Sequence, residues 1–389
     1  MEKNNELFRT NYFVKLLIIT NYLGNRGGLG RYSFEVVKAL ESYAIDMKVI
    51  SEASTPTVPF EHNILRPVFR QKPVRRIWNF ILNIYTVRRF AKNVDIIHAH
   101  DGWPYGVYGW LAVLGTSKKL FITGIGTYTL APLQETLMGM LLCRSYRRAE
   151  VILCISDYLR SQLKELCPEV VTTTVLMGPP SLPVPNDEQL RNFGLTYKIS
   201  WRYPIILTVG DIKHRKGQLN TLLALKSLQN IYPHFLYIII GSDNDQTYVR
   251  KIIDFVEMHH LQNNILMISN NYDDLTLACF YQSCHLFALS SNNDGLHIEG
   301  FGLALLEAAQ FGKPVVGSRN CGIESALKDG YNGLLTAQGN STDIANKIND
   351  ILGPNYDTYS LHARDFYSRF SWKRTLEIYI QYFTNSAKK

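Results

Sequence analysis

Short apolar segments alternate with helix-length segments along the whole chain, and this alternation restricts the fold more than any other feature. Apolar runs of strand length occur at 14–22, 47–52, 95–100, 119–124, 151–156 and 173–178, and again at 204–210, 235–241, 264–269, 286–291, 314–318 and 333–336. Strands that are apolar along their whole length and separated by helices are typical of parallel sheets covered on both faces. The sequence therefore predicts an α/β fold with two doubly wound sheets.

A proline-rich stretch separates the two series of strands. The segment PPSLPVP at 179–185 contains four prolines in seven residues, which neither a helix nor a central strand accommodates. We therefore expect an N-terminal domain at 1–182 and a C-terminal domain at 183–365, with a final helix at 366–389 that packs back on the N-terminal domain. Two Rossmann-like domains in tandem would face a cleft, with ligands at the carboxyl ends of the strands.

Two features of the composition bear on location. The N-terminal stretch 1–20 has acidic residues where a secretory signal is basic, Lys15 interrupts its apolar run, and no later apolar stretch reaches the length of about 18 residues that spans a membrane. The six cysteines show neither CxxC pairs nor zinc-ligand spacing, as expected for thiols in a reducing compartment. The sequence thus predicts a cytoplasmic protein without a signal peptide or a transmembrane helix.

The basic residues are concentrated in the first half. Residues 1–185 contain 22 Lys and Arg against 14 Asp and Glu, which accounts for the whole formal charge of +8, and segment 66–92 alone has eight basic residues and no acidic one. A helix from about Val74 would align Ile77, Phe80, Ile81, Ile84 and Val87 on one apolar stripe. It is either a core helix with solvated arginines or a patch for an anionic membrane surface. Nucleic acid is not favoured, because no nucleic-acid-binding module surrounds the segment.

The stretch HIEGFGLALLE at 297–307 places glutamates on both sides of a Gly-Phe-Gly turn that leads into a helix. Glycines let backbone amides approach a ligand closely, and the positive end of a helix favours an anion such as phosphate. Beside such an anion, Glu299 is suited to accept hydrogen bonds from sugar hydroxyls, and Glu307 could reach a ribose diol. The pattern predicts a site for a nucleotide-diphosphate sugar; the simpler alternative is two glutamates without a ligand.

A second loop agrees with this prediction. The stretch TVGDIKHRKGQ at 208–218 is a strand end and glycine turn followed by basic residues, so Arg215 and Lys216 could reach phosphates, although solvated cations are the alternative. The loop GNRGGLGRYS at 24–33 fits neither the P-loop nor the GxGxxG pattern, so a dinucleotide fingerprint is unsupported. We find no DxD-type carboxylate pair placed for a metal ion.

At these residues the chain resembles the family 4 glycosyltransferases, which are retaining enzymes of the GT-B fold. The motifs GGLGRYSFEVVKAL, DIIHAHD, VGDIKHRKG and EGFGLALLEAAQFGKPVVGS followed by GIESALKDGYNGLL stand in the family's order and spacing over nearly the whole chain. The resemblance implies a hexosyltransferase of class EC 2.4 that uses a nucleotide-diphosphate sugar without a metal cofactor. It also implies a saccharide or lipid-linked acceptor in envelope, lipopolysaccharide or exopolysaccharide biosynthesis, at the inner face of the membrane.

The resemblance assigns roles to individual residues. It implies that Glu307 binds the ribose, that Glu299 binds the donor sugar and that Lys216 neutralises the diphosphate. The remaining donor-side residues that it implies are Gly210 and Arg215, the amides of Phe301, Gly302 and Leu303, and Gly28 and Gly30 from the opposite domain.

Two positions depart from the family's pattern. The family has an arginine directly after the glycine of its VG motif; here that residue is Asp211, and Arg215 is the candidate substitute. The family's strand–His–Gly motif aligns so that the histidine position falls on Ile125. The alternative to an active enzyme is therefore a catalytically impaired relative that binds only nucleotide sugar or membrane.

Without that histidine, the polar residues at the end of the strand DIIHAHD are the nearest candidates for acceptor chemistry. His100 and Asp101 could position the acceptor or act as a base, whereas His98 could be a core histidine. We expect Tyr128 on the acceptor side. The predicted catalytic residues are Glu299, His100 and Lys216.

Overall fold

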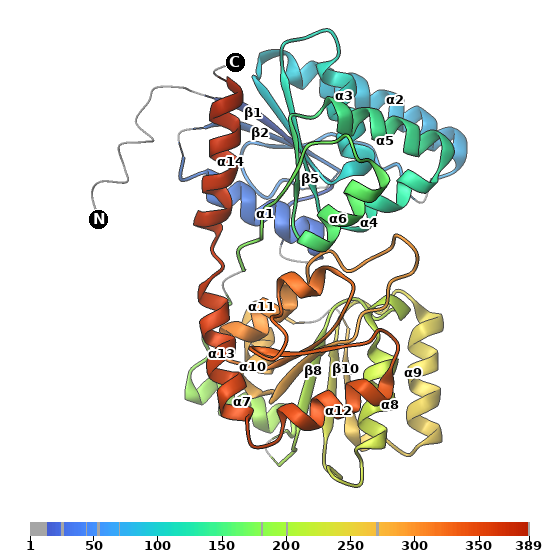
Figure 1. The fold of residues 1–389 in the computed structure, drawn as a ribbon, viewed down its shortest axis with the longest axis vertical. Helices are drawn as coiled ribbons and strands as arrows, with labels where there is room; N and C mark the ends of the chain where they lie inside the picture. The colour runs from blue at the N-terminus through green and yellow to red at the C-terminus, as the bar shows by residue number, and fades with distance from the viewer. Residues whose placement is uncertain are drawn as a thin grey trace, which may run out of the picture. The chain divides into compact units, whose positions relative to one another are not determined.

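The computed structural model describes residues 14–24, 27–43, 45–52, 55–69, 71–179, 182–199, 201–269 and 272–387. Most of the N-terminal stretch, Arg70 of the basic segment, and Pro180 and Ser181 of the proline-rich stretch lie outside the described residues. The chain forms two compact units (Figure 1). Unit 1 comprises Met1–Ile155, Arg160–Val175 and Trp372–Lys389, and unit 2 comprises Ser156–Leu159 and Leu176–Ser371.

Unit 1 is built on a seven-stranded sheet in the order β3-β2-β1-β4-β5-β6-β7, with every neighbouring pair parallel. Its central strands are buried along their whole length, which is why they read as continuous apolar runs in the sequence. The strands are β1 (Lys15–Ile19), β2 (Asp46–Ser51), β3 (Glu61–Asn63), β4 (Ile96–His100), β5 (Lys119–Gly124), β6 (Val151–Cys154) and β7 (Thr172–Thr174).

Helices cover both faces of this sheet. Helix α1 packs with the C-terminal α14, and α3 packs with both α2 and α5 (Figure 1). The helices are α1 (Gly28–Leu40), α2 (Pro73–Phe90), η2 (Ala91–Asn93), η3 (Gly102–Gly106), α3 (Val107–Val113), α4 (Thr127–Leu130), η4 (Ala131–Gln134), α5 (Thr136–Arg148), α6 (Asp157–Leu166) and α14 (Trp372–Ala387).

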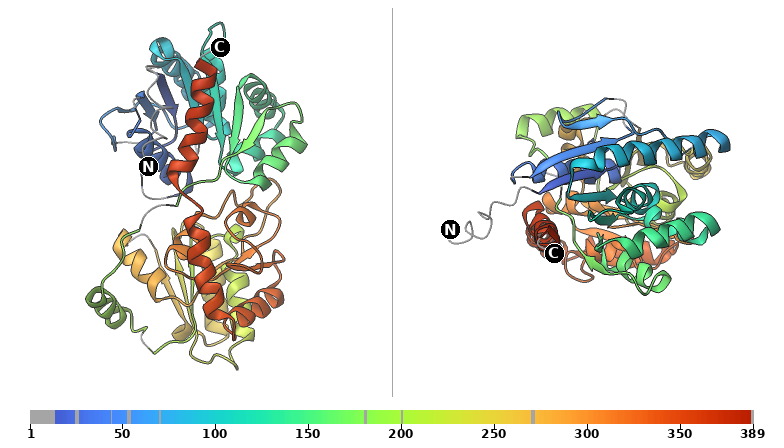
Figure 2. Two further views of the ribbon diagram at one scale, coloured as in Figure 1. Left: turned by 60° about the vertical axis from the view of Figure 1, so that its left-hand side comes forward. Right: turned by 90° about the horizontal axis from the view of Figure 1, so that it is seen from above.

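The last helix of the chain is part of the first unit. The hydroxyls of Tyr379 in α14 and Tyr32 in α1 lie 2.5 Å apart, and both side chains are fully buried. The rings of Tyr379 and Phe383 each lie 5.5 Å from the ring of His98 on β4. Figure 2 shows α14, in red, running along unit 1. The core of unit 1 therefore contains side chains from both ends of the chain.

Unit 2 contains a six-stranded parallel sheet in the order β10-β9-β8-β11-β12-β13. Its strands are β8 (Ile205–Val209), β9 (Leu236–Ile240), β10 (Ile265–Ile268), β11 (Leu286–Leu289), β12 (Val315–Ser318) and β13 (Gly333–Thr336). Its helices are α7 (Asp187–Tyr197), η5 (His214–Lys216), α8 (Gln218–Ser227), α9 (Gln246–Met258), η6 (Gln262–Asn264), α10 (Asp274–Ser283), α11 (Leu303–Gln310), η7 (Gly322–Ser325), α12 (Ser341–Ile351) and α13 (Tyr356–Ser368).

The predicted fold class is confirmed, because both sheets are parallel and alternate with helices. In each sheet the strand order reverses next to the first strand, at β1/β4 in unit 1 and at β8/β11 in unit 2. Such switch points are where doubly wound sheets bind ligands, beyond the carboxyl ends of the strands.

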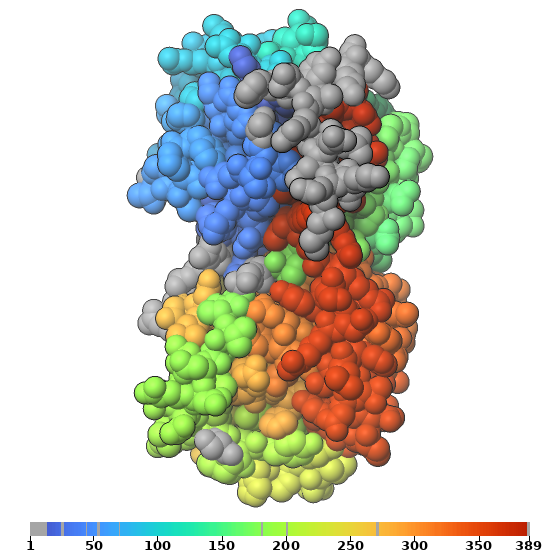
Figure 3. Space-filling model, turned by 90° about the vertical axis from the view of Figure 1, so that its left-hand side faces the viewer, coloured from blue at the N-terminus to red at the C-terminus, as the bar shows by residue number. Residues whose placement is uncertain are grey.

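Helix α13 packs with α11 and reaches the surface of unit 2, where it is seen among the red atoms in Figure 3.

The interpretation of 66–92 as a core helix holds for only part of its predicted stripe, in which Val87 is buried and Phe80 and Ile84 are half-buried. Within α2, Val87 is buried, but Ile77 and Ile81 are 62% and 52% exposed. The helix instead buries Asn79 and Asn83 together with Val87. The two asparagines of this helix favour the face on which their amides find backbone partners, because an unpaired buried amide is costly. Among the described residues, no helix has the length and apolar character needed to cross a bilayer.

Candidate active site

The loop after β8 brings the predicted phosphate-binding cations to the carboxyl end of the unit 2 sheet. Gly210 ends the strand with a positive φ of 148°, and a side chain there would lie 3.5 Å from Lys216 Nζ. Gly217, with φ 68°, leads from η5 into α8, and a Cβ at this position would come within 1.8 Å of the Ser290 carbonyl oxygen. Both turns require glycine, and together they fix where Arg215 and Lys216 lie.

Glu299 forms the centre of a charged cluster with these two cations. Its Oε2 lies 2.7 Å from Lys216 Nζ and 3.0 Å from Arg215 Nη1. Arg215 Nη1 also donates to the Ile298 carbonyl over 2.9 Å, which ties the guanidinium to the segment that carries the glutamate. Three residues that the sequence predicts as donor ligands, on two loops far apart in the chain, are therefore in direct contact.

The electrostatics of the cluster keep Glu299 ionised. Burial would raise the pKa of this carboxyl, but the charges of Lys216 and Arg215 outweigh burial and lower its pKa to about 2. Burial also lowers the pKa of the Lys216 ammonium, and the nearby Glu299 opposes that effect. Such a buried pair is suited to a ligand that brings both a phosphate for the cations and hydroxyls for the carboxylate.

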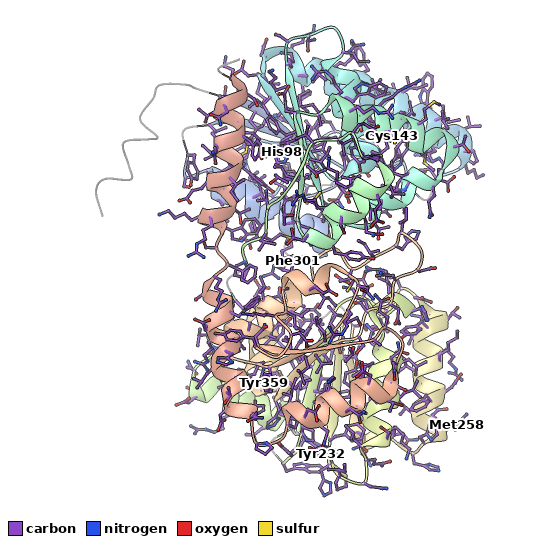
Figure 4. The ribbon with its side chains drawn as sticks, in the orientation of Figure 1. His98, Cys143, Tyr232, Met258, Phe301 and Tyr359 are labelled. Atoms are coloured by element: carbon purple, nitrogen blue, oxygen red, sulfur yellow. The ribbon has the colours of Figure 1, made fainter. Side chains whose placement is uncertain are left out.

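The N-terminus of α11 lies directly after Glu299. Gly302, with φ 85°, is the N-cap of the helix and has no side chain that could cap the first amides. Phe301 is buried, with its ring centroid 6.2 Å from that of Phe370 on unit 2, and Figure 4 labels it at the start of α11. Gly322 packs so tightly on this turn that a Cβ there would lie 2.0 Å from the Gly300 carbonyl oxygen. The amides of Gly302 and Leu303 thus begin a helix whose positive end favours an anion.

Glu307 lies within α11 and is buried, at 5% exposure. Its Oε2 accepts a hydrogen bond of 2.6 Å from the hydroxyl of Tyr281 on α10. The Tyr281 ring is in turn stacked on Phe311, with the planes 4° apart. Sequence reasoning missed Tyr281, because a tyrosine within the apolar helix 274–283 gives no local signal of its partner.

Asp211 occupies the position at which the family has an arginine. Its carboxylate is largely exposed and lies 2.8 Å from Lys213 Nζ. Arg215, the candidate substitute, is directed to Glu299 and Ile298. The local group of Asp211, Lys213, Arg215, Lys216 and Glu299 thus has three cations against two carboxylates and carries an excess of one positive charge.

In unit 1 the two histidines of β4 are fully buried. His98 Nε2 lies 2.8 Å from Thr123 Oγ1, and His100 Nδ1 lies 2.9 Å from Ser33 Oγ on α1. Burial lowers the pKa of His98 to about 3, and burial together with His98 lowers the pKa of His100 well below its usual value. Both imidazoles are therefore neutral inside the unit (His98 is labelled in Figure 4). This environment suits a positioning role through α1 for His100, whose catalytic role stays a prediction.

Asp101, the next residue, organises the turn that contains the missing histidine position. It is buried with a φ of 82°, and its Oδ1 accepts from the Gly102 amide over 2.8 Å and from Thr129 Oγ1 over 2.7 Å. The Ile125 amide donates to the same Thr129 hydroxyl over 3.0 Å. Burial raises the pKa of Asp101 to about 6, against these hydrogen bonds. Asp101 thus holds the β5–α4 turn, which carries Ile125 and Tyr128.

A cavity of about 590 Å³ opens at this end of unit 1. Five aromatic side chains line it, and polar groups from the β1–α1 and β2–β3 loops face them. The aromatic residues are Tyr22, Phe69, Trp103, Tyr105 and Tyr128, and the polar ones are Asn21, Glu52, Thr55 and Thr57. Of the predicted acceptor residues, Tyr128 lines this cavity, and its ring centroid is 4.9 Å from that of Phe69.

Gly28 and Gly30 have different surroundings in the α1 turn. A Cβ at Gly30 would lie 2.1 Å from the ring of Tyr22, so this glycine admits the tyrosine that lines the cavity. Nothing lies within 4 Å of a Cβ at Gly28, and the residue is exposed. Only Gly28 has the open backbone expected of a residue beneath a ligand.

Glu52 is the carboxylate of the cavity, and sequence reasoning did not single it out. It accepts a hydrogen bond of 3.0 Å from the hydroxyl of Tyr105, which is itself buried. Burial raises the pKa of Glu52 to about 7, although the bond from Tyr105 acts in the opposite direction. The one signal of Glu52 in the sequence is its position directly after the buried strand β2. Aromatic faces beside a carboxyl group are suited to a ligand with both apolar and hydroxyl surfaces.

No group of three or more His, Cys, Asp or Glu side chains within the described part of the chain is arranged to hold a metal ion. The cationic side chains of the turn after β8 are those of Lys213, Arg215 and Lys216. These side chains can neutralise a diphosphate by themselves, since arginine and lysine bind phosphate directly.

Comparisons with known proteins agree over both units. Residues 26–173 match the family model described as Glycosyltransferase Family 4, and residues 197–359 match that described as Glycosyl transferases group 1. An uncharacterised glycosyltransferase of Methanocaldococcus jannaschii is 25% identical over 367 residues, which is 93% of this chain and 95% of that protein.

Solved structures of GT-B glycosyltransferases share the fold. Sucrose-phosphate synthase of Thermosynechococcus elongatus superimposes with a TM-score of 0.79 at 18% identity, covering 97% of this chain and all of that one. The Anabaena protein HepE, solved in complex with UDP-glucose, gives a TM-score of 0.75 at 18% identity, covering 96% of this chain and 98% of that one. At such identities the likeness concerns the fold.

Proposed function

Because the chain belongs to the family 4 glycosyltransferases, we propose that it transfers a hexose from a nucleotide-diphosphate sugar to a saccharide or lipid-linked acceptor. As a member of this family it is a glycosyltransferase that uses a nucleotide sugar. The observation that carries the finer proposal is the contact of Glu299 with Lys216 and Arg215 beside the N-terminus of α11. Cations, helix amides and a carboxylate then meet at one turn of unit 2.

The charged and uncharged parts of the donor would contact different groups of this site. Its diphosphate carries the negative charge that Lys216, Arg215 and the first amides of α11 attract. Its sugar hydroxyls would donate to Glu299, and its ribose hydroxyls would donate to Glu307, whose orientation Tyr281 supports. UDP-glucose is the first donor to test, because a protein of the same fold binds it.

Transfer with retention requires no protein nucleophile in this scheme. As the bond from the anomeric carbon to the diphosphate breaks, negative charge grows on the leaving oxygen, and Lys216 and the α11 amides stabilise it. The acceptor hydroxyl attacks on the same face and gives its proton to that phosphate oxygen. Ile125 is compatible with this route, because the phosphate rather than an imidazole takes the proton.

We propose that the cavity of unit 1 receives the acceptor. Sugars present apolar C–H faces and polar hydroxyl edges, and the cavity offers both aromatic rings and Glu52, Thr55 and Thr57. Its volume of about 590 Å³ is within the ordinary range of about 300–1,000 Å³ for small-molecule sites. We therefore propose an oligosaccharide end as the acceptor; synthesis of an envelope polysaccharide or lipopolysaccharide is the pathway that the family resemblance implies.

We propose the cytoplasm as the site of action. All six cysteines are free, including Cys143 and Cys167, whose sulfur atoms lie 3.2 Å apart. Thiols this close remain unpaired most readily in a reducing compartment.

A second candidate function rests on the two departures from the family's pattern. Asp211 engages Lys213 where an arginine is expected, and Ile125 replaces a histidine. A relative that binds nucleotide sugar without transferring it would retain the Glu299 cluster and lose chemistry in unit 1.

Binding of UDP-, GDP- and ADP-sugars followed by calorimetry, with Glu307→Ala and Lys216→Ala as controls, tests the donor site. Binding of one donor that both variants abolish is the expected result. Slow hydrolysis of that donor to nucleoside diphosphate and free sugar then separates an active enzyme from the binding-only relative, which would leave the donor intact. Binding that both variants retain would refute the site.

A further inference from the structure

Helix α2 buries two asparagines, Asn79 and Asn83, and leaves several large apolar side chains exposed. Asn83 accepts a hydrogen bond from the Arg66 amide and donates one to the Arg66 carbonyl, each over 2.8 Å. Asn79 donates to the Pro67 carbonyl over 2.8 Å, and Asn83 also donates to the Tyr108 hydroxyl over 3.1 Å. These bonds connect the helix to the segment before it and to α3, so its rotation about its own axis is fixed.

With that rotation fixed, five large apolar side chains face solvent. They stand at relative positions 0, 3, 4, 7 and 11, which places them on one stripe about 100° wide, opposite Asn79 and Asn83. Their exposed fractions are far above those of core residues: Val74 82%, Ile77 62%, Trp78 61%, Ile81 52% and Tyr85 69%. We call this stripe, with the exposed basic residues Lys72, Arg75, Arg88 and Arg89, the α2 face.

The basic residues lie at both ends of the stripe. Lys72 and Arg75 are at the first turn, and Arg88 and Arg89 are at the last. No acidic residue occurs between 62 and 94 in the sequence. Arg88 also donates a hydrogen bond to the Leu114 carbonyl over 3.4 Å and remains exposed. The α2 face thus combines apolar surface, which is favourably removed from water, with positive charge.

Helix α5, on the same side of the sheet as α2, has a smaller surface of the same character (Figure 1). Leu137 and Met140 are 63% and 45% exposed, and Arg144 follows them on the same helical stripe. Large exposed apolar side chains therefore occur on both helices that pack against α3. Scattered apolar residues are normal on protein surfaces, but an aligned group of this size marks an interaction site.

We propose that the α2 face docks the protein onto an anionic lipid bilayer. A helix of 18 residues, about 27 Å long, would lie in the plane of the interface with its aliphatic side chains below the headgroups. The arginines at its ends would then meet phosphate groups. Trp78 and Tyr85 belong to the two residue types that prefer the headgroup level.

Charge and surface chemistry favour a bilayer over the other occupants. A symmetric dimer through this face brings the same patch of both copies together, so four basic residues would oppose four. A nucleic acid satisfies the cations but offers no apolar surface for Val74, Ile77 and Ile81. An anionic bilayer satisfies both the cations and the apolar stripe.

This inference deepens the proposed function and rests on it in one respect: a docked transferase implies that the acceptor saccharide is carried on a lipid. The docking itself is independent of the donor site, because no residue of the α2 face belongs to the Glu299 cluster. Vesicle binding and donor binding can therefore succeed or fail separately.

The test is sedimentation of the full chain with phosphatidylcholine vesicles that contain phosphatidylglycerol, against vesicles of phosphatidylcholine alone. Binding to the anionic vesicles that weakens with added salt is expected. Replacing Arg75 and Arg89 by Gln should lower the partition coefficient about 25-fold, at about fivefold for each charge. Replacing Ile77 and Ile81 by Ser should lower it at least tenfold at any salt concentration.

Matched controls come from unit 2. Leu361 and Met258 are 70% and 72% exposed, and Ser at both positions should leave vesicle binding unchanged. Trp78→Phe keeps an aromatic ring and should still bind, but quenching of tryptophan fluorescence by brominated lipids should fall sharply. All variants change exposed side chains, so their melting temperatures should match that of the parent chain.

Equal sedimentation with both vesicle types, or α2 variants that bind like the parent, would overturn the proposal. So would a stable dimer that Ile77→Ser with Ile81→Ser converts to monomer without any vesicle binding by the parent chain. Vesicle binding without any donor binding would keep the docking surface and refute the proposed function, whereas transfer to a soluble acceptor without vesicle binding would do the reverse.

Discussion

The hydroxyl of Tyr281 donates a hydrogen bond of 2.6 Å to Glu307 Oε2, so a residue of α10 orients the carboxylate that we assign to the ribose. We expect Tyr281→Phe to weaken donor binding about fivefold, because Glu307 loses its fixed orientation, and to destabilise the fold by about 1 kcal/mol. Calorimetry with the best donor measures the first effect and urea unfolding measures the second. Glu307→Gln, which keeps the shape, is the control; unaltered binding by Tyr281→Phe would mean that Tyr281 has no part in orienting the carboxylate.

Lys216 should matter far more than its neighbour Lys213. Lys216→Met removes one of the two cations that pair with the buried Glu299 and leaves only Arg215. We therefore expect the free energy of unfolding to fall by about 3 kcal/mol and donor binding to weaken at least tenfold. Lys213→Met breaks an exposed pair with Asp211 and should cost less than about 1 kcal/mol. Both can be measured by chemical unfolding and calorimetry. Equal effects of the two substitutions would contradict the central position of Glu299.

Thr129→Val should impair transfer without affecting donor binding. The hydroxyl connects the Ile125 amide to Asp101 Oδ1, so its removal leaves a buried carboxylate with one partner fewer and loosens the turn that carries Tyr128. We expect a stability cost of about 1–3 kcal/mol, and a rise in the KM for acceptor. A donor dissociation constant that changed as much as the acceptor KM would place the effect outside unit 1.

Glu52 should make stability fall as pH rises from about 4.5 to 7. Its pKa is raised to about 7 in the folded chain, so the folded state holds a proton that the unfolded state has already released, and the penalty is complete above pH 7. Glu52→Gln should therefore stabilise the protein at pH 8, by about 3 kcal/mol at most. Asp101, with its pKa raised to about 6, acts in the same direction at lower pH. The difference between parent and variant unfolding curves across pH isolates Glu52; a constant difference would show that Glu52 does not titrate there.

His100 should leave no mark on the pH dependence of transfer. Burial and His98 lower its pKa well below the usual value, so it is neutral throughout the range in which an exposed histidine titrates. If it acts by holding Ser33 on α1, His100→Gln and Ser33→Ala should lower kcat/KM alike without altering the shape of the pH profile. A limb near pH 6.5 that only His100→Gln removes would instead identify His100 as the catalytic base.

The strands, and the closeness of Glu299 to Arg215 and Lys216, could be predicted because their signals are local. Strands such as β4 and β9 are buried along their whole length and appear in the sequence as mainly apolar runs. The turn after Glu299 can be recognised from the glycines next to it. What could not be predicted depends on partners far away in the chain. Tyr281 meets Glu307 across 26 positions and Tyr105 meets Glu52 across 53, with no pattern in either segment.

The exposure of Ile77 and Ile81 on α2 could not be decided from the sequence for a related reason. Counting apolar residues at helical spacing places Ile77 and Ile81 on the inward face, because it treats asparagine as a surface residue. The actual face is decided by carbonyl and amide groups at Arg66 and Pro67, which accept and supply the hydrogen bonds of Asn79 and Asn83. A pattern within one helix cannot reveal such backbone partners in the preceding segment.

The position of α14 has a consequence for synthesis of the chain. Domains usually fold in the order in which they leave the ribosome. Here the side chains that cover Tyr32 and His98, those of Tyr379 and Phe383, are translated only after all of unit 2. During synthesis, unit 1 would therefore lack α14 while unit 2 folds. A fragment ending at Val175 would expose to chaperones the apolar surface that α14 covers.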